Sequence, residues 1–274
     1  MRAEAGDLRS LALARIAIGA ILLARTTPLL APLHLHFLGD TSPLLGWPDR
    51  GWHAPLFGIA LPAALVAALC LIRTAAAIAL LLGVFSRPAG IAAGVTGYLV
   101  VAQDELAFVQ TLHLLFGSAI LLGLGDAGAA FALRPDRPRA PASSVWLLRI
   151  WVASVYAWAA LAKLQPDWLD GRAFAFFQES HALRGPIADA LLATSARRIL
   201  LARGVAAIEL LLGPALLFRR TRRIALPMAF AFHVGIELMS RPDFIGWTMA
   251  ALLLCFLPSH GAQKASAAGQ ATSA

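Results

Sequence analysis

The chain has 274 residues, of which 59% are hydrophobic and only 14% are charged, and its mean hydropathy is +0.73. A soluble domain carries roughly 25% charged residues, so this chain has too few to cover a water-facing surface. The net charge of +8 is expected where basic residues gather in cytoplasmic loops, and no basic stretch interleaved with aromatics indicates nucleic-acid binding. Apolar runs long enough to cross a bilayer recur along the chain, which predicts an all-α, polytopic helical bundle in the membrane.

The hydrophobic pattern predicts about eight transmembrane helices. In chain order they cover about Leu8–Leu30, Leu65–Phe85, Pro88–Ala102, Leu106–Gly125, Val145–Leu164, Ile199–Phe218, Ile224–Leu238 and Phe244–Leu257. The stretch Ala54–Phe85 is longer than one span needs, and a short interfacial helix before the second span accounts best for it. Residues 1–258 form the predicted transmembrane domain, and the small, polar segment 259–274 is predicted to be a disordered tail.

The basic residues outside these spans predict the orientation. If both termini are cytoplasmic, most of them fall on the cytoplasmic side, including Arg137 and the run Arg219–Arg223. The other side receives fewer, four of them in the long segment 165–198, and long segments count less toward orientation. We therefore expect a multi-pass protein of the inner (plasma) membrane, with Lys163 at the outer end of the fifth helix.

Lys163 is the most informative single residue, because it ends an almost wholly apolar helix. An ammonium costs about 2.5–3.5 kcal/mol at mid-depth in a bilayer and less near the interface. One interpretation is a catalytic base. The other is a lysine that snorkels to the interface, with Trp158 and Trp168 as belt residues. Pro166 ends the helix, and Asp167 is expected to fold back near the ammonium.

Glu209 lies in the middle of the sixth predicted helix. A carboxylate at that depth is protonated, paired or hydrogen-bonded. A structural clamp with an arginine, such as Arg203, Arg149 or Arg15, is one interpretation, and a catalytic role is the other.

His233 and Glu237 stand at positions i and i+4 of the seventh predicted helix, so they share one helix face. They form either a buried hydrogen-bonded pair or a working pair, and one His/Glu pair is too little to predict a metal site. His113 of the fourth helix is a candidate for the same cavity. Cys70 and Cys255 lie in apolar runs without metal-type spacing.

The segment Tyr156–Gly171, which reads YAWAALAKLQPDWLDG, resembles the signature of the vitamin K-dependent gamma-carboxylases and their bacterial relatives, the HTTM (horizontally transferred transmembrane) proteins. Similar segments follow the family's order to about Pro258: LARIAIGAILL with Arg15, LLGVFSR ending at Arg87, AAIELLLGPALL around Glu209, RRIALPMAFAFHVGIEL around His233, and LLLCFLP. The Ala/Arg/Leu-rich composition suggests a GC-rich bacterial source.

The resemblance implies a chemistry for Lys163. In the carboxylases the lysine at this place is the base that deprotonates reduced vitamin K, and the oxygenation to the epoxide supplies a strong base for carboxylating glutamate. The implied substrates are a reduced quinone, such as menaquinone or vitamin K, and O₂. The family also has a catalytic histidine after the third span, where the alignment brings Thr111 or Leu112, with His113 beside them. The large extramembrane domain that holds the protein substrate has no counterpart, so peptide carboxylation is not expected.

Two functions remain open from the sequence. The first is an enzyme that oxygenates a reduced quinone-like lipid, with Lys163 as base and His113 as a second catalytic candidate. The second is a non-enzymatic membrane scaffold or partner subunit whose polar residues are structural clamps. Transport is less favoured, because the sequence shows no internal repeat. The residues expected to line the cavity or bind substrate are Asp167, Trp168, Glu209, His233, Glu237 and Arg15.

Overall fold

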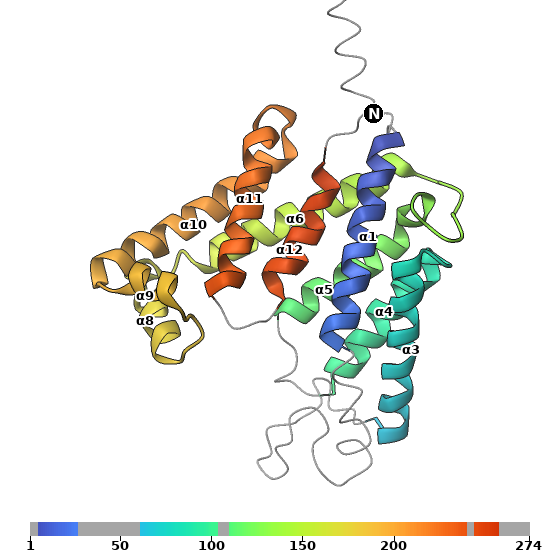
Figure 1. Cartoon of the computed structure of the whole chain (residues 1–274), viewed down its shortest axis with the longest axis horizontal. Helices are drawn as coiled ribbons and strands as arrows, with labels where there is room; N and C mark the ends of the chain where they lie inside the picture. The colour runs from blue at the N-terminus through green and yellow to red at the C-terminus, as the bar shows by residue number, and fades with distance from the viewer. Residues whose placement is uncertain (1–4, 27–60, 104–109, 240–243, 258–274) are drawn as a thin grey trace, which may run out of the picture. The chain divides into compact units, whose positions relative to one another are not determined.

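A computed structural model describes residues 5–26, 61–103, 110–239 and 244–257, and the regular structure in these ranges is entirely helical (Figure 1). Eleven α-helices and two 3-10 helices occur there, without a strand. The predicted all-α fold is therefore confirmed for the part of the chain that the structure describes. The predicted disordered tail, the stretch from Ala54 to Ala60 and the residues after Thr26 in the first predicted span lie outside the described residues.

Three of the described helices are long and apolar enough to cross a membrane, namely Ala64–Leu82, Ala142–Ala162 and Ser195–Leu217. Two further apolar helices, Gln110–Leu124 and Ile245–Phe256, are shorter. A bilayer core of about 30 Å needs about 20 apolar helical residues, so length and composition identify a helical membrane protein. The total of eight spans stays a prediction.

The chain divides into two compact units, and unit 1 comprises Met1–Leu148 and Leu257–Ala274. Its described helices are α1 (Ala5–Thr26), α3 (Ala63–Leu82), α4 (Ser86–Val101), α5 (Gln110–Leu124), the 3-10 helix η3 (Ala127–Ala129) and the beginning of α6 (Pro141–Ala162). Helix α4 packs against both α3 and α5, and α1 packs against α3 and α5 (Figure 1). A Cβ at Gly94 of α4 would stand 2.5 Å from the carbonyl oxygen of Phe116, so glycine permits the close approach of α4 and α5.

Arg15 holds unit 1 together at the end of α3. The side chain is fully buried, and its Nη1 donates to the carbonyl oxygens of Leu80 at 2.5 Å and Leu81 at 3.1 Å. Its Nε donates to Ala127 at 3.1 Å and its Nη2 to Phe131 at 2.5 Å. The last carbonyls of a helix have no partner within that helix, so this guanidinium ties α1 to the end of α3 and to the segment around η3.

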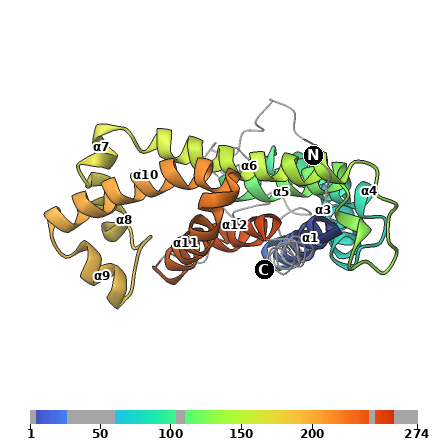
Figure 2. The same ribbon diagram turned by 90° about the horizontal axis from the view of Figure 1, so that it is seen from above.

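Unit 2 comprises Arg149–Phe256. It contains the rest of α6 and then α7 (Pro166–Leu169), α8 (Arg172–Glu179), α9 (Pro186–Leu192), α10 (Ser195–Leu217), α11 (Arg219–Met239), α12 (Ile245–Leu253) and the 3-10 helix η4 (Leu254–Phe256). Helix α11 packs against α10 and α12, and α7, α8 and α9 gather beside the first part of α10 (Figure 2).

Proline and glycine set the boundaries around the end of α6. Pro166 occupies the first turn of α7, where its missing N–H costs nothing. Gly171 has φ +80° and separates α7 from α8, and a Cβ there would stand 2.9 Å from the backbone nitrogen of Ile199. A residue with a side chain would be strained at this position, so glycine allows the α7–α8 turn to lie against α10.

Candidate functional site

Lys163 directly follows the last residue of α6, and its ammonium pairs with Glu209 of α10. The two atoms of the ion pair, Nζ and Oε2, are 2.7 Å apart, and the side chains are 19% and 9% exposed. Nζ also donates to the carbonyl oxygen of Ala159 at 3.3 Å and lies 5.0 Å from the ring centroid of Trp168. A lysine and a glutamate from two different helices thus neutralise each other inside unit 2.

Two local features bring these side chains together. A Cβ at Gly213 would stand only 3.0 Å from the carbonyl oxygen of Ala153, so glycine lets α10 approach α6 one turn beyond Glu209. Trp168 donates from Nε1 to the carbonyl oxygen of Ala202 at 3.0 Å, and its ring packs 5.2 Å from that of Phe174. The indole is therefore fixed between α7, α8 and α10, with one face available to the ammonium.

Tyr156 and His233 form a second buried pair, between α6 and α11. The Tyr156 hydroxyl and His233 Nε2 are 2.7 Å apart, and both residues are buried. His233 Nδ1 is buried without a hydrogen-bond partner among the described residues. A neutral imidazole has one donor and one acceptor nitrogen, so Nδ1 keeps unused hydrogen-bonding capacity whichever nitrogen carries the proton.

The two pairs belong to one cluster. Gly213, one turn after Glu209 on α10, lies against Tyr156, since a Cβ on this glycine would stand 3.4 Å from the Cβ of Tyr156. Three helices of unit 2 therefore contribute an amine, a carboxylate, a phenol and an imidazole to one region of a largely apolar bundle. Such a set of titratable groups can accept and donate protons, which is the chemistry of general acid–base catalysis.

Glu237 has a different task from His233, although the two share a face of α11. Its Oε1 accepts the backbone N–H of Gly246 at 2.7 Å and that of Trp247 at 3.3 Å. Both groups belong to the first turn of α12, where backbone N–H groups lack partners within the helix and negative charge is favourable. Glu237 thus caps α12.

Asp167 does not take the place that we expected beside the ammonium. Its side chain is 77% exposed and pairs with Arg172, with 3.1 Å between Oδ1 and Nη1. Pro166 starts a new helix, and Asp167 lies on the outward side of its first turn. The backbone N–H and the guanidinium of Arg172 hold the pKa of the exposed Asp170 below its ordinary value.

The arginines expected as partners of Glu209 have other described contacts. Arg203 donates from Nε to the carbonyl oxygen of Leu169 at 3.2 Å, and Arg149 donates from Nε to that of Cys255 at 3.0 Å. The partner of Glu209 is Lys163. Two ionisable groups of opposite sign in consecutive predicted spans were the available sequence signal for this pair.

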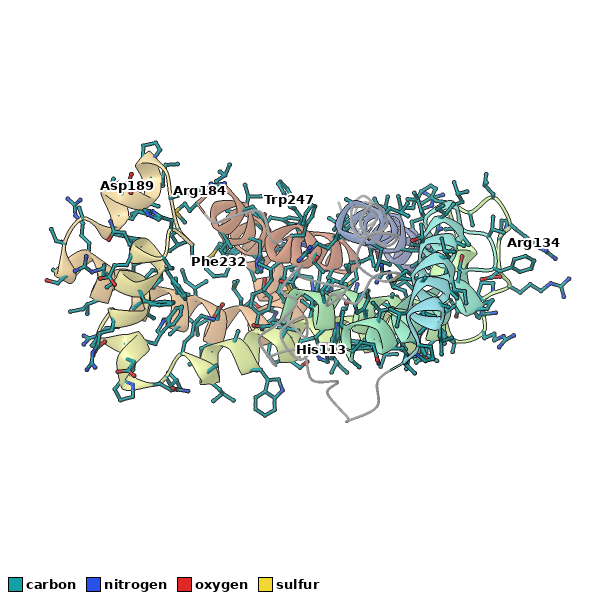
Figure 3. All side chains as sticks on the ribbon, turned by 90° about the horizontal axis from the view of Figure 1, so that it is seen from below. His113, Arg134, Arg184, Asp189, Phe232 and Trp247 are labelled. Carbon is teal, nitrogen blue, oxygen red and sulfur yellow. The ribbon has the colours of Figure 1, made fainter. Side chains whose placement is uncertain are left out.

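His113 and Arg15 both belong to unit 1 and have contacts of their own. His113 of α5, labelled in Figure 3, is exposed, and its Nδ1 is 2.8 Å from the Tyr98 hydroxyl. The two tyrosines of the chain thus each pair with a histidine, a regularity that sequence reasoning overlooked. The membership of His113 and Arg15 in the Lys163 cavity stays a prediction.

No group of three or more His, Cys, Asp or Glu side chains that could hold a metal occurs among the described residues. A family model described as HTTM domain matches residues 4–260, which is nearly the whole chain. Searches of curated proteins and of solved structures found no match. The family match agrees with the long apolar helices and with the segment around Lys163. The chain belongs to the HTTM domain family of membrane proteins.

Proposed function

We propose that the protein is a membrane enzyme that deprotonates a reduced quinone, with Lys163 as the base. The Lys163–Glu209 pair beside the Tyr156–His233 hydrogen bond is the observation that carries this proposal. The HTTM family match adds support, because the segment around Lys163 resembles the membrane domain of the carboxylases, in which a lysine acts on reduced vitamin K.

The ion pair suggests how an ammonium becomes a base. A proton that moves from Nζ to Oε2 of Glu209, across 2.7 Å, leaves a neutral amine and a neutral carboxylic acid without changing the net charge of the site. The amine then takes the hydroxyl proton of the reduced quinone, so an O–H bond breaks and an N–H bond forms. The resulting anion lies beside an ammonium, and the attraction between them is strong in a medium of low dielectric constant. O₂ then oxidises this electron-rich anion. One oxygen atom enters the proposed epoxide, and the other leaves as water together with the two hydroxyl protons of the reduced quinone.

The surroundings of Lys163 fit a lipid-soluble substrate. Trp158, Leu161 and Leu164 are exposed on the last turns of α6 and just beyond it. Exposed apolar side chains in a membrane helix face acyl chains, so a quinone dissolved in the bilayer can approach the end of α6. We further propose eight spans in the inner membrane with both termini cytoplasmic, which places Lys163 near the outer surface.

The test is an epoxidation assay with purified protein, reduced menaquinone or reduced vitamin K, and O₂. Wild type is expected to form epoxide, and Lys163→Ala is expected to lose at least about a hundredfold in rate, the lower range for removal of a general base. Lys163→Arg is the matched control, because arginine keeps the charge facing Glu209 but does not give up its proton. A wild type that neither binds the quinone nor forms epoxide would rule out the proposal.

A structural clamp is the second candidate function, and the contacts of the ammonium favour it. Lys163 has an anionic partner, a carbonyl acceptor and an aromatic face, so its charge is compensated without any substrate. In a scaffold or partner subunit, the same contacts would fix α6 against α10. Loss of stability in Lys163→Ala, with no activity to lose in wild type, would support this candidate.

A further inference from the structure

A dense positive charge lies at the turn between α10 and α11. Four arginines occur within five residues, Arg219, Arg220, Arg222 and Arg223, and we call them the basic turn. Arg219, Arg220 and Arg223 are exposed and have no hydrogen bond or ion pair among the described residues. Helix α11 begins at Arg219, so all four arginines lie at the N-terminal end of this helix. The turn that joins α10 to α11 can be followed in Figure 1.

Arg222 differs from the other three. Its Nε donates to the carbonyl oxygen of Leu216 at 2.7 Å and its Nη2 to that of Leu217 at 3.0 Å. Its guanidinium also lies 5.5 Å from the ring centroid of Phe256. Arg222 therefore satisfies the last carbonyls of α10, and the other three arginines remain available for a ligand.

No acidic side chain among the described residues pairs with the three exposed arginines of the basic turn. Arg219 and Arg223 are four residues apart and Arg220 and Arg223 three, spacings at which like charges repel on a helix. The partial positive charge of the helix N-terminus adds to this repulsion. No acidic residue occurs between Glu209 and Glu237 in the sequence. Binding of an external anion would therefore offset the repulsion among the three arginines and the helix N-terminus.

The flanks of the basic turn are apolar and exposed. Leu211 and Phe218 project before it, and Ile224 and Met228 project after it. A free phosphate ion would need only the guanidinium groups. The combination of exposed cations with an adjoining exposed apolar surface matches an amphiphile, whose charged head and acyl chains require both.

We propose that the basic turn binds the phosphate group of an anionic phospholipid, whose acyl chains lie along the exposed apolar side chains of α10 and α11. The planar guanidinium fork of arginine donates two parallel hydrogen bonds to phosphate oxygens. The predicted orientation puts the turn on the cytoplasmic side, where the leaflet carries anionic lipid. This binding site is independent of the chemistry proposed for Lys163.

Native mass spectrometry of the purified full chain tests the proposal with phosphatidylglycerol and phosphatidylcholine of identical acyl chains. Wild type is expected to retain phosphatidylglycerol more tightly. A basic residue near an anionic surface contributes about fivefold in affinity. The triple variant Arg219→Gln/Arg220→Gln/Arg223→Gln is therefore expected to bind phosphatidylglycerol about a hundredfold more weakly than wild type. The matched variant Arg219→Lys/Arg220→Lys/Arg223→Lys keeps the charge and is expected to keep most of the preference.

Two controls make the result decisive. Arg172→Gln removes an arginine that already pairs with Asp167 and Asp170, and it is expected to leave lipid retention unchanged. Inorganic phosphate at the lipid concentration is expected not to displace phosphatidylglycerol. Equal retention of the two lipids by wild type, an unaffected glutamine variant, or displacement by phosphate would each overturn the proposal. If the glutamine variant loses its helical circular dichroism, the wild-type comparison and the lysine variant decide the question.

Discussion

At the residue scale, the Lys163–Glu209 pair predicts an asymmetry between single and double substitutions. Lys163→Met leaves the Glu209 carboxylate buried without its counter-charge, which costs about 3–5 kcal/mol of unfolding free energy. Lys163→Met/Glu209→Leu removes both charges and keeps similar side-chain volumes, so most of that loss is expected to be recovered. Chemical unfolding of wild type, both single variants and the double variant in detergent measures the coupling. Strictly additive effects would show that the two side chains do not stabilise each other.

The same double variant separates the two candidate functions. If Lys163 is a base, the double variant folds but forms no epoxide, because no amine is present to take the hydroxyl proton. If the pair is only a clamp, the double variant recovers most of the wild-type stability, and wild type itself forms no epoxide. Stability and activity therefore answer different questions about one pair of residues.

Arg73 makes the opposite prediction, because its guanidinium has no hydrogen-bond partner and no acidic partner among the described residues. The side chain is fully buried in α3, and none of its three guanidinium nitrogens has a hydrogen-bond partner among the described residues. Cys70 stands three residues earlier on the same helix, and a thiol sulfur is only a weak hydrogen-bond acceptor. Arg73→Met replaces the charge with an apolar side chain of similar length, and it is expected to raise the unfolding free energy by about 1–4 kcal/mol, as replacements of buried charge have done elsewhere.

The comparison with Arg73→Ala supplies the control for this prediction. Alanine also removes the charge but leaves a cavity, and truncating a large buried side chain to alanine costs about 2–5 kcal/mol. Arg73→Met is therefore expected to be the more stable of the two by thermal unfolding. A destabilised Arg73→Met variant would contradict the prediction and would show that the guanidinium has a partner.

At the scale of elements, Asp126 organises the segment between α5 and α6. Both carboxylate oxygens accept the backbone N–H of Arg139 at 3.0 Å, and Oδ2 also accepts that of Ala140 at 2.8 Å. The Arg87 guanidinium pairs with Oδ1. Burial alone raises the pKa of Asp126, but these donors outweigh it and hold the pKa below its ordinary value. The ionised carboxylate thus joins the start of α4 to the start of α6.

This lowered pKa predicts acid sensitivity with a definite sign. A carboxylate whose pKa is lower in the folded state contributes stability above its unfolded pKa of about 3.9, and that contribution is lost as pH falls through the folded value. Asp126→Asn is expected to lose about 1.5–3 kcal/mol at pH 7, the range for hydrogen bonds to a charged group. It is also expected to flatten the decline of wild-type stability below about pH 4. Thermal unfolding from pH 3 to pH 7 measures both, and parallel curves for the two proteins would contradict the assignment.

The long helices were predictable from the sequence, whereas the short ones were not. The predicted spans Pro88–Ala102 and Ile199–Phe218 correspond to α4 and α10, because a continuous apolar run marks a helix whatever it packs against. Helices α8 and α9 were missed in the segment 165–198. Each is shorter than three turns and mixes apolar with charged residues, and its position depends on Gly171 and on packing against α10.

The members of the candidate site were partly predictable, but their pairing was not. Lys163, Glu209 and His233 stand out because each places a titratable group in an apolar run. Which of them meet depends on how α6, α10 and α11 approach one another. The sequence alone does not show that Gly213 is the residue at which α10 comes close to α6. Tyr156 was overlooked, since a tyrosine in a membrane helix is commonplace until a histidine is found beside its hydroxyl.

At the scale of the whole molecule, the acid–base groups belong to a different unit from the Arg15 and Asp126 networks. Tyr156, Lys163, Glu209 and His233 all lie in unit 2. Arg15 and the Asp126 network lie in unit 1, where they hold helix ends and the segments between helices. The cluster of titratable groups in unit 2 therefore comes from helices of that unit alone. The Arg73 and Asp126 variants change stability without removing any of these groups.

The proposed topology gives the last prediction, which concerns the two surfaces of the membrane. Basic residues concentrate on the cytoplasmic side of membrane proteins, so Arg137 is expected inside and the segment 165–198 outside. Both Arg137 and Ala193 are exposed, and single cysteines at these positions are expected to react with a maleimide that cannot cross membranes. Ala193→Cys should react in spheroplasts, and Arg137→Cys should react only in inside-out vesicles. The native Cys70 and Cys255 are buried, so the background is expected to be low. Labelling of both positions from the same side would overturn the eight-span arrangement and, with it, the placement of Lys163 near the outer surface.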